Sequence, residues 1–75
     1  MKTAIKDFYG KIIGFIQSYP NGDKKAFDVH GKILGTYKKK QDVTMDFYGR
    51  IVARGDTTSA LVWQANATLN IPQNK

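Results

Sequence analysis

The sequence has no cysteine and no glutamate, and only two of its 75 residues are proline. The absence of cysteine excludes disulfides and thiolate metal ligands. All six acidic residues are aspartate. Aspartate favours turns whereas glutamate favours helices, so this bias predicts a chain rich in turns and poor in helix. No run of apolar residues approaches the length of a membrane span, so we expect no membrane segment.

What the sequence does have is an excess of positive charge on a single small domain. Twelve lysines and arginines face six aspartates, which gives a net charge of +6 over 75 residues. Such an excess on so small a body raises the affinity for polyanions, whatever the fold. The N-terminal stretch is interrupted by charges and glycines and does not resemble a signal peptide, so a cytoplasmic location is expected.

An internal repeat is the most informative feature of the chain. Residues 7–14 (DFYGKIIG), 28–35 (DVHGKILG) and 46–53 (DFYGRIVA) share the pattern Asp-x-x-Gly-basic-Ile-aliphatic-small. Aspartate at the first position and glycine at the fourth favour a type I turn followed by a left-handed residue, the usual longer hairpin connection with a bulge. We therefore predict that Gly10, Gly31 and Gly49 lie at hairpin tips with positive φ.

A fourth, less regular hairpin is expected near residues 60–69. Asn66 stands there in the place of the tip glycine, since asparagine also tolerates the left-handed region. The polar segments 19–23, 38–42 and 55–59 would be the linkers between hairpins. The predicted fold is all-β, a pseudo-four-fold arrangement of short hairpins without a helix, with one domain at 1–71 and a frayed tail at 72–75.

The apolar residues of the repeats suggest how these hairpins would pack. The two residues before each tip glycine are mostly aromatic or aliphatic, which is unusual for an exposed turn. We expect the tips to turn inward and to form the core together with Ile12, Ile33 and Ile51. A small residue in mid-strand, such as Gly14 or Gly35, marks a bend or a close approach of another segment.

The repeated hairpins resemble the bacterial four-fold beta flower family. The resemblance covers residues 3 to about 71 and depends on the repeated Asp-x-x-Gly-Lys-Ile-x-Gly pattern. It implies a pseudo-four-fold ring of hairpins and no established activity or catalytic residue. The fourth unit departs from the pattern, because it lacks both the aspartate and the basic residue.

Lys11, Lys32 and Arg50 occupy one equivalent position in the three repeats. In a radial fold they would form a partial cationic ring able to bind an anion. The simpler interpretation pairs each with the aspartate of its own turn, Asp7, Asp28 or Asp46, with little effect on stability. The sequence favours this second interpretation, because residues that flank a turn are close neighbours.

The other basic residues gather in two clusters. These candidates for contact with a nucleic acid are Lys24, Lys25, Lys38, Lys39 and Lys40. Tyr19 and Tyr37 lie near them, and aromatic rings beside lysines can stack on the bases of a single strand. Alternatively, the lysines belong to solvated loops that keep the protein soluble. Nucleic-acid binding is therefore the second hypothesis for function.

No catalytic, cofactor-binding or metal-ligating group is predicted. His30 is the only histidine and replaces a tyrosine of the other repeats, so the fold explains its place. A general base or a metal ligand needs convergent partners, and the chain offers no cysteine, glutamate or second histidine.

The leading hypothesis is a non-catalytic module that binds a protein or a further copy of itself. Its apolar residues exceed what a thin ring of hairpins would cover, and such a surplus often forms a contact patch. The residues in excess are Phe15, Ile16, Phe27, Val62 and Trp63. Of these, we expect Trp63 and Phe15 to contact the partner.

Overall fold

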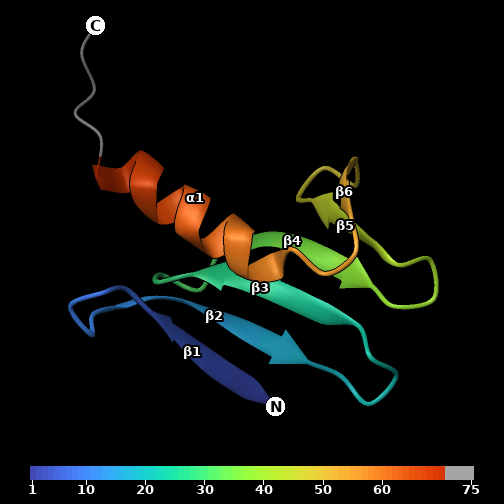
Figure 1. Ribbon diagram of the computed structural model, residues 1–75, viewed down its shortest axis with the longest axis horizontal. Coiled ribbons are helices and arrows are strands. Elements are labelled where there is room, and N and C mark those ends of the chain that lie inside the picture. Colours follow the sequence, from blue (N-terminus) through green and yellow to red (C-terminus); the bar gives the residue numbers. More distant parts are fainter. Residues whose placement is uncertain (71–75) are drawn as a thin grey trace, which may run out of the picture.

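The computed structural model describes residues 1–70, which form one antiparallel sheet with a helix on it (Figure 1). The six strands follow one another across the sheet in chain order. Their bounds are β1 Lys2–Lys6, β2 Ile12–Ser18, β3 Lys24–Asp28, β4 Ile33–Lys38, β5 Val43–Asp46 and β6 Ile51–Arg54, and the helix is α1 Thr58–Asn70. The prediction of a hairpin-rich β fold is confirmed. The tail predicted at 72–75 lies outside the described residues.

Each repeat forms the turn of one hairpin, as predicted. Gly10, Gly31 and Gly49 have φ values of 81°, 86° and 83°, in the left-handed region that favours glycine. Each donates its backbone N–H to the carbonyl of the aspartate three residues earlier. The strand pairs β1–β2, β3–β4 and β5–β6 also shift register near these tips, as expected for a β-bulge.

The predictions of a fourth hairpin and of a helix-free chain are wrong, because the segment from Thr58 forms α1. Asp56 starts this helix: its Oδ1 accepts hydrogen bonds from the backbone N–H of Thr58 at 3.1 Å and from the Thr58 hydroxyl at 2.7 Å. Residues 59–67 contain no glycine or proline and three alanines, which suits a helix. Asn66 therefore lies on α1 and not at a turn. The described residues form three hairpins side by side in one sheet. The four-fold arrangement of hairpins therefore remains a prediction.

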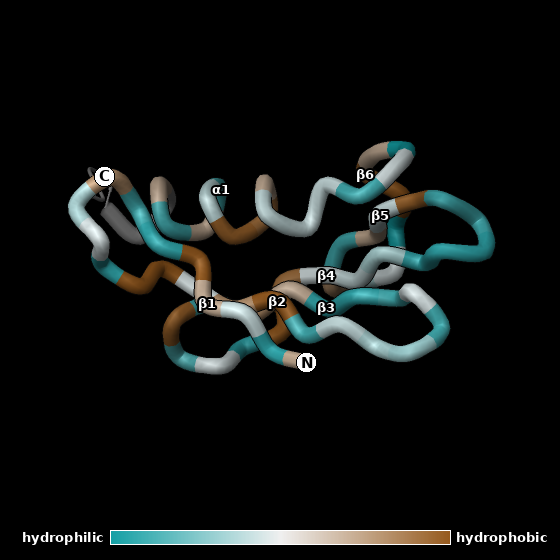
Figure 2. Tube along the Cα trace, turned by 60° about the horizontal axis from the view of Figure 1, so that its bottom comes forward, coloured by the Kyte–Doolittle hydropathy of each residue, from teal (hydrophilic) through white to brown (hydrophobic). Residues whose placement is uncertain are grey.

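The helix covers one face of the sheet, over β2, β3 and β4 (Figure 2). Glycines at the two mid-strand positions let it come close. A Cβ atom added to Gly14 would lie 2.5 Å from Cγ1 of Val62, and one added to Gly35 would lie 2.6 Å from Cδ1 of Leu61. The close approach predicted for these glycines is confirmed, and the segment that approaches is α1.

The core lies between α1 and the central strands. Ile13, Ile16, Ala26 and Val62 form it, with Ile5, Leu34 and Leu61 packed against it. The predicted core is wrong in two respects. Ile12 and Ile51 are 39% and 64% exposed, because the residue that follows each isoleucine is the extra residue of the bulge, which turns the isoleucine away from α1. The tip aromatics are exposed as well.

Candidate interaction surfaces

The three hairpin tips have the same hydrogen-bonded geometry. In the first, Oδ1 of Asp7 accepts hydrogen bonds from the backbone N–H groups of Tyr9 at 2.9 Å and Lys11 at 3.0 Å. Asp28 and Asp46 hold their own turns in the same way. Each aspartate thus fixes the backbone of the turn, and the two residues before the glycine contribute only backbone groups to it.

The tips project their side chains into solvent at one end of the sheet. Alternate connections of a meander lie at the same end, so the three repeats share it. Phe8 is 93% exposed, Tyr9 94%, Phe47 59% and Tyr48 77%. The prediction that these rings turn inward is wrong, because α1 lies on a face of the sheet and leaves this end open. We call the residue pairs 8–9, 29–30 and 47–48 the tip row.

Trp63 contacts the tip row from the helix. Its ring centroid lies 5.5 Å from that of Phe8, and 36% of the residue is exposed. Phe15, the other candidate for protein contact, is half-buried on β2. Phe15 lies on the opposite face of the sheet from α1, so the structure does not bring the two candidates together.

The repeated basic residues lie at the tip end as well. Arg50 pairs with Asp46, with 3.0 Å between Nε and Oδ2, and its guanidinium lies 5.4 Å from the Tyr48 ring centroid. The hydrogen bonds from the Arg50 and Tyr48 backbone and from the Arg50 side chain hold the pKa of Asp46 below its usual value. Within residues 1–70, Lys11 and Lys32 form no ion pair with the aspartates of their turns. The pairing interpretation therefore holds only for Arg50.

The lysine clusters lie at the other end of the sheet. Two of the five lysines are paired: Nζ of Lys24 lies 2.6 Å from Oδ2 of Asp56, and Nζ of Lys38 lies 3.9 Å from Oδ2 of Asp23. Lys39 donates its backbone N–H to Asp23. Lys39 and Lys40 are exposed on the turn between β4 and β5.

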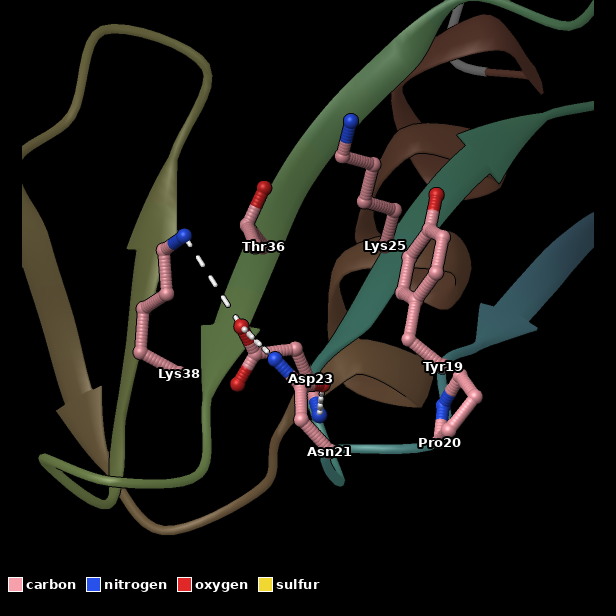
Figure 3. A pocket seen from close by; sticks show the side chains of 7 residues that line it. All are labelled: Tyr19, Pro20, Asn21, Asp23, Lys25, Thr36 and Lys38. Atoms are coloured by element: carbon pink, nitrogen blue, oxygen red, sulfur yellow. Dashed lines mark hydrogen bonds and ion pairs between the residues drawn. The ribbon is translucent and has the colours of Figure 1, made fainter.

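Lys24 and Lys25 are neighbours in sequence, but they point to opposite faces of the sheet, because strand residues alternate. Lys25 and Lys38 line a shallow hollow together with Tyr19 and Thr36 (Figure 3). In this view α1 lies behind the strands, so the hollow belongs to the face that the helix does not cover.

We call this second face, with Lys2, Phe15, Lys25, Phe27 and Thr36, the open face. Phe15 and Phe27 are direct cross-strand partners, and Gln17 and Lys25 form the next such pair on the same side. Nζ of Lys2 lies 5.1 Å from the Phe15 ring centroid and 5.4 Å from that of Phe27. Nζ of Lys25 lies 5.9 Å from the Tyr19 ring centroid. Sequence reasoning did not associate Lys2 or Phe27 with the lysine clusters. The sequence feature that could have placed Phe27 on the same face as Lys25 is the alternation of side chains along β3.

Tyr37 does not belong to this group. It is 5% exposed, and its hydroxyl donates a hydrogen bond to Oδ1 of Asp42 at 2.7 Å. This bond, together with burial and the nearby carboxylates, raises the pKa of Tyr37 to about 12. Tyr37 is thus a structural residue and is not available to stack on a base.

The two edges of the sheet differ. β1 carries Lys2 and Lys6 at its ends, and such charges protect an edge strand from pairing with another chain. β6 carries a charge only at Arg54, and Ile51 and Val52 are 64% and 51% exposed. The β5–β6 hairpin is therefore the less protected edge.

His30 is exposed in the tip row. In the part of the chain that the structure describes, no group of three or more His, Asp or Glu side chains is placed to hold a metal ion. The one helix within residues 1–70, α1, is not long and apolar enough to cross a bilayer.

No protein-family model, curated protein or solved structure matches the chain.

Proposed function

We propose that this protein is a non-catalytic module that associates with a further copy of itself through the edge strand β6. The observation that supports this best is the exposure of Ile51 and Val52, 64% and 51%, on an edge strand whose only charge is at its end. An exposed apolar edge offers unpaired backbone groups and apolar side chains together, which favours pairing with another strand. A second copy provides the same strand, and an antiparallel β6–β6 pair is the symmetric, self-complementary solution.

The adjoining tip would enlarge such a contact. Phe47 and Tyr48 belong to the same hairpin as β6, are 59% and 77% exposed, and pack edge-on with centroids 5.4 Å apart. Aromatic residues are enriched in protein interfaces. The hairpin thus presents four large apolar side chains within a few residues of one another.

The experiment is sedimentation of the parent and of Ile51→Lys over a range of concentrations. We expect the parent to change from monomer to dimer as concentration rises, and the variant to remain a monomer, because the substitution removes an apolar side chain from the contact and adds a positive charge to the edge strand of both copies. Thr3→Lys is the matched control, since it adds the same charge to an exposed position of the other edge strand, β1. A monomeric parent at all concentrations, or equal loss of association in both variants, would contradict the proposal.

The resemblance to the four-fold beta flower family, and the arrangement it implies, remain proposals that rest on the three repeats. An experimental structure of the associated protein tests them. Hairpins related by quarter turns about one axis would support the four-fold arrangement. Copies related only through β6 would argue against it.

A further inference from the structure

We propose that the open face binds single-stranded nucleic acid, with bases stacked on Phe15 and Phe27 and phosphates beside Lys2 and Lys25. This inference goes beyond self-association and uses a different face of the sheet from the edge at β6. It rests on the pairing of two aromatic rings with lysines on a face that α1 does not cover.

The aromatic part of the platform is held by register. Phe15 and Phe27 face each other across β2 and β3, so their rings are neighbours on one surface. Both residues are half-buried, so each keeps part of its surface exposed. Tyr19 extends the apolar surface at the end of β2 and is 37% exposed. Aromatic rings on the surface of a sheet can stack on the bases of a single strand, because every base has a π-face.

The charged part of the platform consists of two lysine ammonium groups that lie over these rings, from which a bound phosphate would draw them. Nζ of Lys2 lies within 5.4 Å of both phenylalanine ring centroids, and Nζ of Lys25 lies 5.9 Å from that of Tyr19. Neither ammonium group is among the ion pairs formed within residues 1–70. Lys38 lines the same hollow but is 3.9 Å from Asp23. The local charge is therefore positive, as the phosphates of a strand require.

Single strands fit this surface better than a duplex does. In a duplex the bases are stacked inside and present only their edges, so the rings of a flat sheet would have nothing to stack on. A single strand exposes base faces and phosphates together. Charge attraction alone would bind single strands and duplexes equally well. A comparison of the two affinities therefore distinguishes stacking from charge attraction.

The experiment is fluorescence anisotropy with a labelled oligothymidylate of about twelve nucleotides, a length within the range of small stacking folds. We expect saturable binding at low salt that weakens steeply as salt rises. We expect Phe15→Leu and Phe27→Leu each to weaken binding by about fivefold or more, because leucine keeps the apolar packing but removes the stacking ring. Urea unfolding of each variant establishes that it is folded. Tyr19→Leu changes an exposed ring and tests the platform without touching the packed residues.

Lys25→Gln and Lys40→Gln are the matched pair for charge. Both remove one positive charge, but Lys40 lies on the turn after β4 and not on the open face. Weaker binding in Lys25→Gln with little change in Lys40→Gln supports the site. Equal effects of the two, unchanged binding in all the ring variants, equal affinity for a duplex of the same sequence, or no binding at low salt would each overturn it. None of these outcomes depends on whether Ile51→Lys abolishes self-association.

Discussion

At the scale of single residues, the aspartate and the glycine of each repeat have different roles in the turn. The aspartate side chain satisfies two backbone donors of its turn. The glycine takes a φ that other residues adopt only with strain. Around Gly31 there is open space, with nothing within 4 Å of an added Cβ atom. Its requirement for glycine is therefore purely conformational.

We expect Gly31→Val to lower the free energy of unfolding by about 1–3 kcal/mol through backbone strain. Gly31→Asn should cost less, because asparagine tolerates the left-handed region. Urea unfolding curves of the three proteins measure this series. A valine variant that unfolds at the same urea concentration as the parent would show that the turn does not need its positive φ.

At the scale of elements, the first turn of α1 depends on a carboxylate. Asp56 accepts two hydrogen bonds from Thr58 through Oδ1 and pairs with Lys24 through Oδ2 at 2.6 Å. Partial burial acts to raise the pKa of Asp56, but Lys24 and the Thr58 donors together outweigh it and hold the pKa below its usual value. The charged carboxylate is therefore preferred in the folded state, and it links the start of the helix to β3.

This preference predicts an acid-dependent loss of stability. Because the folded pKa is lowered from 3.8, the contribution of Asp56 is present above this unfolded value and is lost as pH falls through the folded pKa. Asp56→Asn keeps an oxygen for the helix cap but loses the charge. We expect this variant to be less stable than the parent at neutral pH, with a difference that shrinks as the pH falls below the unfolded value and through the folded pKa. Urea unfolding of both proteins across pH measures it. A difference independent of pH would contradict this role of the charge.

The sequence predicts the turns well because their determinants are local. An aspartate and a glycine three residues apart define hairpin geometry without reference to the rest of the chain. The sequence does not predict α1 in the same way. The repeat pattern, extended to a fourth unit, indicates a hairpin over residues 60–69, although the composition of residues 59–67 favours a helix. The exposure of the tip row depends on where α1 lies, which no single repeat specifies.

The candidate surfaces were predicted only in part. The lysine clusters are recognisable from the sequence, but their division between two faces depends on the alternation of side chains along the strands. Ile16 and Val62, expected as surplus apolar surface, are 8% and 0% exposed because α1 packs there. The pairing of Phe15 with Phe27 needs the register of β2 and β3, which the linker between them sets. A sequence pattern alone does not give that register.

At the scale of the whole molecule, the net charge of +6 acts on the two proposed interactions in opposite directions. Copies of the protein repel one another, so self-association has to overcome that repulsion. A nucleic acid attracts the same charge, and its binding releases counterions.

Added salt should therefore strengthen self-association while it weakens oligonucleotide binding, because it screens both the repulsion and the attraction. Sedimentation and anisotropy over the same series of salt concentrations measure the two trends. Self-association that weakens with salt would indicate an interface held by ion pairs and not by the apolar edge at β6.

The shared geometry of the three hairpin tips also has a practical consequence. Aspartate and glycine recur in every tip, while the two residues between them are Phe-Tyr, Val-His and Phe-Tyr. These residues are exposed, and they contribute only backbone groups to the turn, which the aspartate side chain holds. The protein thus offers three short positions at one end of a single sheet where pairs of side chains can be exchanged while the hydrogen bonds of each turn are kept.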